Sequence, residues 1–174
     1  MKKQIRILTF NRIQLQLLSL KQFEPNVAVI SITDHEAPLV HFVNEPKFLL
    51  RTSFNDVGFD EFWDTNTKLE IDEKEAFEKN YHVISTMQAK EIANFYHKII
   101  SDNVDTIICQ CEHGVSRSAA VKAAILEYEA QRGIEVFANK HLSPSKTVFK
   151  RVLKALIAKR ATHETIQLLS LTEE

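Results

Sequence analysis

The sequence feature that most constrains the fold is an apolar run that ends at a cysteine and re-emerges, after a short polar segment, as an alanine-rich stretch. It reads IICQCEHGVSRSAAVKAAI and spans residues 107–125. The short apolar run is typical of a buried strand, and the alanine-rich stretch favours a helix. We therefore predict a strand, a tight loop and a helix in direct succession.

The rest of the chain repeats this alternation. Strands are predicted at residues 5–10, 27–33, 47–54 and 105–110, where apolar and β-branched residues gather. Strands that alternate with helices predict an α/β fold, here a largely parallel central sheet of about four to five strands flanked by helices. With 174 residues and 44% hydrophobic content, residues 1–174 are expected to form a single domain.

Several helix boundaries can be read from capping signals. Asn11 is expected to cap a helix with Ile13, Leu17 and Leu20 on one face, and Ser85 with Gln88 forms a capping box that opens a helix ending near Ser101. The helix after the loop is expected to end at Gly133 as its C′ residue. A further helix should follow Pro144, with a last one over residues 164–171.

Residues 64–79 hold six acids and three lysines. Few of their side chains would suit a core, so we predict a surface insertion at residues 64–84, either a lid over a site or a solvated connection.

Composition excludes several classes of function. The net charge of −1 gives no global field for nucleic acid, and polar residues interrupt the N-terminal apolar segment before it could serve as a signal or a membrane span. Cys109 and Cys111 are too few for a disulfide framework or a zinc site. We expect a cytoplasmic protein that uses no metal or cofactor and binds no nucleic acid or membrane; its oligomeric state stays open.

The polar segment has the chemistry of an anion cradle. Backbone N–H groups of a loop that opens a helix converge on one point, and Gly114 allows the sharp turn that this requires. Arg117 can offer two parallel hydrogen bonds to a tetrahedral oxyanion. Cys111 lies near the positive end of the helix dipole, which favours its thiolate form. A thiolate that faces a bound phosphate is a nucleophile.

The motif CEHGVSRS, residues 111–118, resembles the C-x5-R-[ST] signature loop of the cysteine-dependent protein tyrosine phosphatases, above all the dual-specificity group and its small prokaryotic relatives. The resemblance implies that Cys111 attacks phosphorus to give a cysteinyl-phosphate, and that Ser118 helps the thiolate to leave. It implies a phosphate site made of Glu112, His113, Gly114, Val115, Ser116 and Arg117. One departure is Gln110, where many family members have histidine. An amide can still hydrogen-bond the loop, so we expect an altered tuning of the thiolate more than a loss of activity.

Such a reaction also needs a carboxylic acid that gives a proton to the leaving group. The family places it on a loop upstream of the nucleophile, so Asp56, Asp60 and Asp64 are the candidates. We favour Asp56, because FNDV follows a predicted strand and resembles the F-D-D-[IV] segment of small prokaryotic members. The alternative is that these aspartates only cap a short helical turn.

Other polar residues have simpler interpretations. Cys109 is expected to be a core side chain, Asp34 a turn residue more than a pocket residue, and His113 a solvated side chain. The segment SPSKTVF loosely resembles a stretch that packs behind the signature loop in dual-specificity phosphatases. The basic segment around it, with Lys140, His141 and Lys146, would attract anionic substrates if it borders the cleft, but the solvated face of an amphipathic helix is the more common explanation.

The sequence thus predicts a phosphatase acting on a phosphorylated protein or a small phosphate ester through a cysteinyl-phosphate. A catalytically weak module that binds a phosphorylated partner is the main alternative. A sulfurtransferase or an arsenate reductase fits less well, because neither the loop length nor the position of Cys109 suits those reactions.

Overall fold

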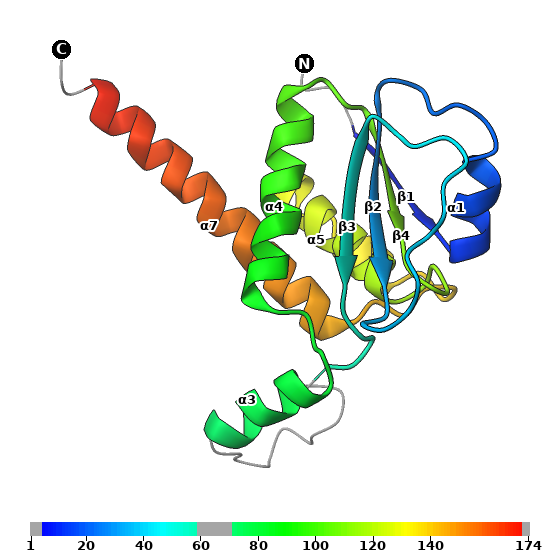
Figure 1. Ribbon diagram of the computed structural model, residues 1–174. Helices are drawn as coiled ribbons and strands as arrows, with labels where there is room; N and C mark the ends of the chain where they lie inside the picture. The colour runs from blue at the N-terminus through cyan, green and yellow to red at the C-terminus, as the bar shows by residue number, and fades with distance from the viewer. Residues whose placement is uncertain (1–4, 59–70, 172–174) are drawn as a thin grey trace.

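The computed structural model describes residues 5–58 and 71–171 of the chain (Figure 1). Within them lies one sheet of four strands in the order β1-β4-β2-β3, and all of its neighbouring strands are parallel. The strands are β1 (Arg6–Phe10), β2 (Val27–Thr33), β3 (Phe48–Ser53) and β4 (Thr106–Gln110). The predicted parallel α/β fold is confirmed, with strands where the sequence placed them.

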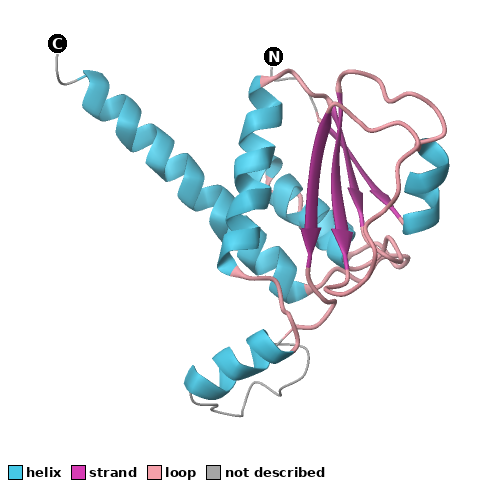
Figure 2. Ribbon diagram, in the orientation of Figure 1, coloured by secondary structure: helices cyan, strands magenta, loops and turns pink. Residues whose placement is uncertain are grey.

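Helices cover both faces of the sheet (Figure 2). On one face lie α4 (Thr86–Ser101) and α5 (Arg117–Ala130), with α7 (Lys146–Leu171) packed on both of them. On the other face lies α1 (Arg12–Leu18), while α6 (Ile134–Phe137) follows α5. Helix α3 (Ile71–Asn80) stands beyond the carboxyl edge of the sheet (Figure 1). No helix in the described part of the chain is long and apolar enough to cross a bilayer.

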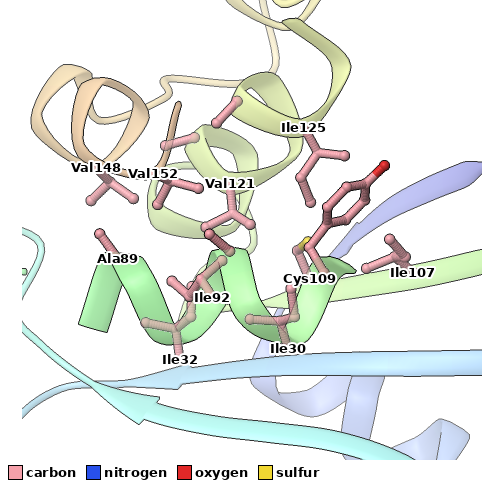
Figure 3. Close-up of a cluster of buried hydrophobic side chains, with 14 of the residues drawn as sticks. Ile30, Ile32, Ala89, Ile92, Ile107, Cys109, Val121, Ile125, Val148 and Val152 are labelled. Atoms are coloured by element: carbon pink, nitrogen blue, oxygen red, sulfur yellow. The ribbon is translucent and has the colours of Figure 1, made fainter. Parts of the chain in front are cut away.

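The main core lies between the sheet and the three helices α4, α5 and α7 (Figure 3). Ile30 and Ile107 reach into it from the strands, and Ile92, Val121 and Val152 meet them from the helices. Each of these side chains is fully buried, and burial of such a side chain stabilises a fold by roughly 1.5–3 kcal/mol. This core fixes β4 and α5, which flank the predicted loop.

Helix α1 corrects one prediction. Asn11 caps the N-terminus of the helix, as predicted, and forms a reciprocal capping box with Gln14. However, Ile13, Leu17 and Leu20 are each more than 60% exposed, and the buried residue is Leu15. The face that packs on the apolar cluster of this side of the sheet carries Leu15, which is buried, and Leu18, which is partly buried.

The end of α5 corrects a second prediction. The left-handed residue that stops the helix is Gln131, with φ of 57°, whereas Gly133 has ordinary right-handed geometry. Gly133 is needed for space instead, because a Cβ there would lie 2.9 Å from both the carbonyl oxygen of Ala123 and the Cβ of Glu127. The glycine therefore reports close packing and not a cap.

The C-terminal segment and the charged insertion also differ from expectation. Residues 164–171 continue α7 without a break and are not a separate helix. Part of the predicted 64–84 insertion, together with Asp60 and Asp64, lies outside the described residues. The described part contains α3, whose residues 73–76 are exposed.

Candidate active site

The candidate site lies where the strands end. Because β2, β3 and β4 are parallel, their carboxyl ends meet at one edge of the sheet (Figure 1), which is where ligands bind in open α/β folds. Asp34 follows β2 directly, Asp56 lies three positions after the end of β3, and Cys111 follows β4 directly. The topology thus brings together three side chains that are up to 77 positions apart in sequence.

The loop of residues 111–116 is seated against the end of β1. The Cys111 N–H donates to the carbonyl of Phe10, with 3.3 Å between nitrogen and oxygen. Gly114 has φ of +75°, and a Cβ on it would lie 2.7 Å from the Asn11 nitrogen. On the other side, the Ser143 N–H donates to the carbonyl of Val115, so the segment SPSKTVF contacts the loop. Backbone contacts therefore hold the loop from both sides.

Replacement of Gly114 by alanine is expected to lower the free energy of unfolding by at least about 2 kcal/mol. Alanine would have to adopt the left-handed backbone conformation of residue 114, and its Cβ would collide with the backbone of residues 10 and 11. Urea unfolding followed by circular dichroism measures the loss. Val115→Ala, at a partly exposed position of the same loop, is the matched control and should change stability by less than about 0.5 kcal/mol. Equal effects of the two changes would contradict this account of the loop.

The nucleophile candidate is buried beside a hydroxyl group. Cys111 is 2% exposed, and its Sγ lies 3.2 Å from the Oγ of Ser118. Ser118 is the second residue of α5, so the sulfur is held close to the start of that helix. A hydroxyl at this distance can donate a hydrogen bond to a thiolate, the contact that the resemblance implied.

Arg117 is held rigidly from two loops. Its guanidinium donates to the carbonyl of Phe54 at 2.7 Å, and the same nitrogen lies 2.6 Å from the Oδ1 of Asp34. Arg117 is 3% exposed, whereas Asp34 is about half exposed. A guanidinium has five N–H donors, so other donors of Arg117 remain for an oxyanion. Sequence reasoning treated Asp34 mainly as a turn residue and missed this role; Phe54 acts through its backbone, which leaves no signal in the sequence.

Asp56 lies against the loop, as the leading candidate for the acid should. The Ser116 hydroxyl donates to its Oδ1 at 2.7 Å, although the two residues are 60 positions apart. The neighbouring Asn55 fixes the backbone there: its N–H donates to the carbonyl of His82 and its side-chain amide donates to that of Tyr81. Asp60 and Asp64, the alternatives, lie outside the described residues.

Gln110 departs from expectation. Its Oε1 accepts a hydrogen bond of 2.7 Å from the hydroxyl of Ser31, the residue opposite it on β2, and not from the loop. Its Nε2 is buried and has no partner among the residues that the structure describes. The amide thus ties β4 to β2 directly before the nucleophile.

Cys109 is a core residue, as predicted. It is fully buried among apolar side chains (Figure 3), and this burial raises the pKa of its thiol to about 12. Cys109 therefore stays protonated at neutral pH and is no rival nucleophile.

The side chains of the remaining predicted residues are exposed or partly exposed. Glu112 faces Arg12 at 3.6 Å, and His113 is exposed, as expected for a solvated side chain. Lys140, His141 and Lys146 are exposed as well.

The fold is that of known phosphatases, although the sequence is distant from them. No protein-family model and no curated protein matches the chain. The structure is similar to human DUSP28, with a TM-score of 0.52 and 13% identity over 90% of this chain and 94% of that one. A mouse putative dual specificity phosphatase complexed with zinc tungstate gives a TM-score of 0.51 and 15% identity over 90% and 84% of the two chains. PTPMT1 in complex with PI(5)P gives 0.50 and 16% over 91% and 94%.

These neighbours are members of the cysteine-based protein tyrosine phosphatase superfamily. The chain therefore has the protein tyrosine phosphatase fold of the dual-specificity type, and the fold expected from the resemblance is confirmed.

Proposed function

We propose that the protein hydrolyses phosphomonoesters, of a phosphorylated protein or a small molecule, through a cysteinyl-phosphate. The observation that carries this proposal is the convergence on one loop of a cysteine paired with a hydroxyl, a fixed arginine and an aspartate. Of the neighbours with this fold, one holds tungstate, a tetrahedral oxyanion, and another holds the phosphate ester PI(5)P, which supports a phosphate-sized ligand.

In the first step the thiolate of Cys111 attacks phosphorus, and the bond between phosphorus and the ester oxygen breaks. Arg117 and the N–H groups of the loop hold the three non-bridging oxygens as charge shifts onto them. Asp56 donates its proton to the departing oxygen, so that an alcohol or phenol leaves instead of its anion.

In the second step a water attacks phosphorus and its proton passes to the Asp56 carboxylate. The bond between sulfur and phosphorus breaks, and inorganic phosphate forms. The electron pair returns to Cys111, whose thiolate the Ser118 hydroxyl stabilises by a hydrogen bond. The site then has its starting charges.

The experiment that tests the proposal is capture of the intermediate in the Ser118→Ala variant. Loss of the hydroxyl removes a charge-assisted hydrogen bond worth roughly 1.5–3 kcal/mol, so hydrolysis of the cysteinyl-phosphate should slow about 10- to 100-fold. We expect one phosphate per chain on Cys111 in rapidly quenched samples with p-nitrophenyl phosphate, measured by mass spectrometry. The wild-type protein, treated identically, should carry less.

Two outcomes would contradict the proposal. Binding of orthovanadate without turnover or intermediate in the wild-type protein would favour a phosphate-binding module. Turnover in which no phosphate is ever found on Cys111 of the Ser118→Ala variant would exclude the cysteinyl-phosphate.

A further inference from the structure

A second pocket lies beside the candidate active site. It is a cavity of about 380 Å³ between the end of β3, the end of α3 and the starts of α4 and α7. For comparison, a water molecule takes about 30 Å³ of liquid, so the cavity has room for a phosphate-sized group together with water. It contains none of the residues assigned above to phosphate binding or proton transfer.

Basic side chains dominate the pocket wall. His35, Lys79, His82 and Arg151 line it, and Glu78 is the single acid on the wall among the residues that the structure describes. That acid is neutralised, because Arg151 pairs with it and also donates to the carbonyl of Ile84. No ion pair of Lys79 is found in the described part of the chain, and Arg151 keeps further N–H donors. An anion would thus meet an excess of positive charge.

Two stacked imidazoles form part of this wall. The rings of His35 and His82 lie 3.6 Å apart between centroids and are tilted by only 11°. Both residues are exposed, so the ring N–H groups can be reached by an anion from solvent. Two imidazolium rings at this distance repel each other, and a bound anion would offset the repulsion. The N–H groups of the two rings can therefore donate hydrogen bonds to a bound anion.

The pocket and the active site share their supports. His35 follows Asp34 and Ser53 precedes Phe54, and both of these neighbours contact Arg117. Asn55 also accepts a hydrogen bond of 2.9 Å from the His35 N–H. Consecutive Cα atoms are about 3.8 Å apart, so the pocket begins about one residue from the groups that hold Arg117.

We propose that this pocket is a second oxyanion site, which takes a phosphate, sulfate or carboxylate group. That group is either a second anionic group of the substrate whose scissile phosphate occupies the Cys111 loop, or a free anion. The part played by the Cys111 loop rests on the proposed function; binding of the second anion does not.

Direct binding tests the site without any turnover. The full-length Cys111→Ser protein is titrated with inorganic sulfate at constant ionic strength, and the ring resonances of His35 and His82 are followed by NMR. We expect shifts of both rings that saturate as the sulfate concentration rises, because the rings line the pocket together with Lys79, Arg151 and Glu78.

The matched variants are Lys79→Gln and Lys98→Gln. Lys79 lines the pocket, whereas Lys98 is an exposed lysine near the far end of α4. Lys79→Gln should weaken sulfate binding about 10-fold and Lys98→Gln should leave it unchanged. Equal affinity in both variants, or shifts that never saturate, would overturn the proposal.

Kinetics then separate the two sources of the anion. The substrates are aryl phosphates that carry a non-hydrolysable phosphonate on tethers of increasing length. If the anion is a second group of the substrate, Lys79→Gln should raise the KM of the substrate with the best tether length about 10-fold. The KM of p-nitrophenyl phosphate should then stay within twofold of the wild-type value. For a free anion, tethers should give no advantage. Sulfate should then act on p-nitrophenyl phosphate turnover in two ways, by competition at the Cys111 loop in both proteins and by a further effect that is present in the wild type and absent in Lys79→Gln. If no substrate turns over, the proposed function fails while the titration still decides on the pocket.

Discussion

The Cys111→Ser variant is expected to lose turnover of p-nitrophenyl phosphate by at least about 1,000-fold. A serine hydroxyl is almost wholly protonated at neutral pH, so it cannot replace a thiolate that attacks phosphorus. The change replaces sulfur by a slightly smaller oxygen that can still pair with the Ser118 hydroxyl, hence binding of inorganic sulfate and the unfolding transition should remain close to those of the wild type. Initial rates at saturating substrate measure the effect.

Cys109→Ala is the control for this variant. The Cys109 thiol is fully buried two residues before the nucleophile and is protonated at neutral pH, because burial raises its pKa to about 12. Its replacement should cost some stability and leave turnover within about threefold. If Cys111→Ser kept its rate, the mechanism would be wrong, and if both variants lost it equally, the loss would report folding.

The fold could be predicted from the sequence because its signals are local. The strand that ends at Gln110, the glycine at 114 and the Ser85 capping box each act within a few residues, and tertiary packing agrees with them. The wrong predictions concern features that are determined by tertiary packing. The sequence of α1 favours a face with Ile13 and Leu17, but the helix packs on the sheet through another face, which carries Leu15 and Leu18.

The candidate site divides in the same way. Cys111, Arg117 and Ser118 lie within one loop and the start of its helix, so their spacing alone reveals them. The partners of Arg117 could not be found in this way, because Asp34 is 83 positions away and Phe54 contributes a backbone carbonyl, which any residue has. The basic pocket draws on four separate segments, which no single stretch of sequence could bring together.

The identity of the proton donor rests on a contact between distant loops, and the Asp56→Asn variant tests it. General acid catalysis contributes about 100- to 10,000-fold, and it matters most when the leaving group is a poor one. We therefore expect a loss of at least about 100-fold in kcat for phenyl phosphate or an alkyl phosphate. The loss for p-nitrophenyl phosphate should be much smaller, since nitrophenolate leaves readily without a proton. Asparagine can still accept the hydrogen bond from Ser116, so the loop should keep its place.

Two comparisons make this pattern specific. Asp34→Asn removes the ion pair that positions Arg117. Because Arg117 would bind the phosphate whatever the leaving group, the loss of kcat should be equal for substrates with good and with poor leaving groups. Asp60→Asn should change neither, if Asp56 is the donor. A loss that depends on the leaving group in Asp60→Asn or Asp64→Asn, and not in Asp56→Asn, would move the acid to that residue. Because Asp34 and Asp56 both lie beside the loop, the dependence on the leaving group, and not the size of the loss, separates a proton donor from a residue that positions the arginine.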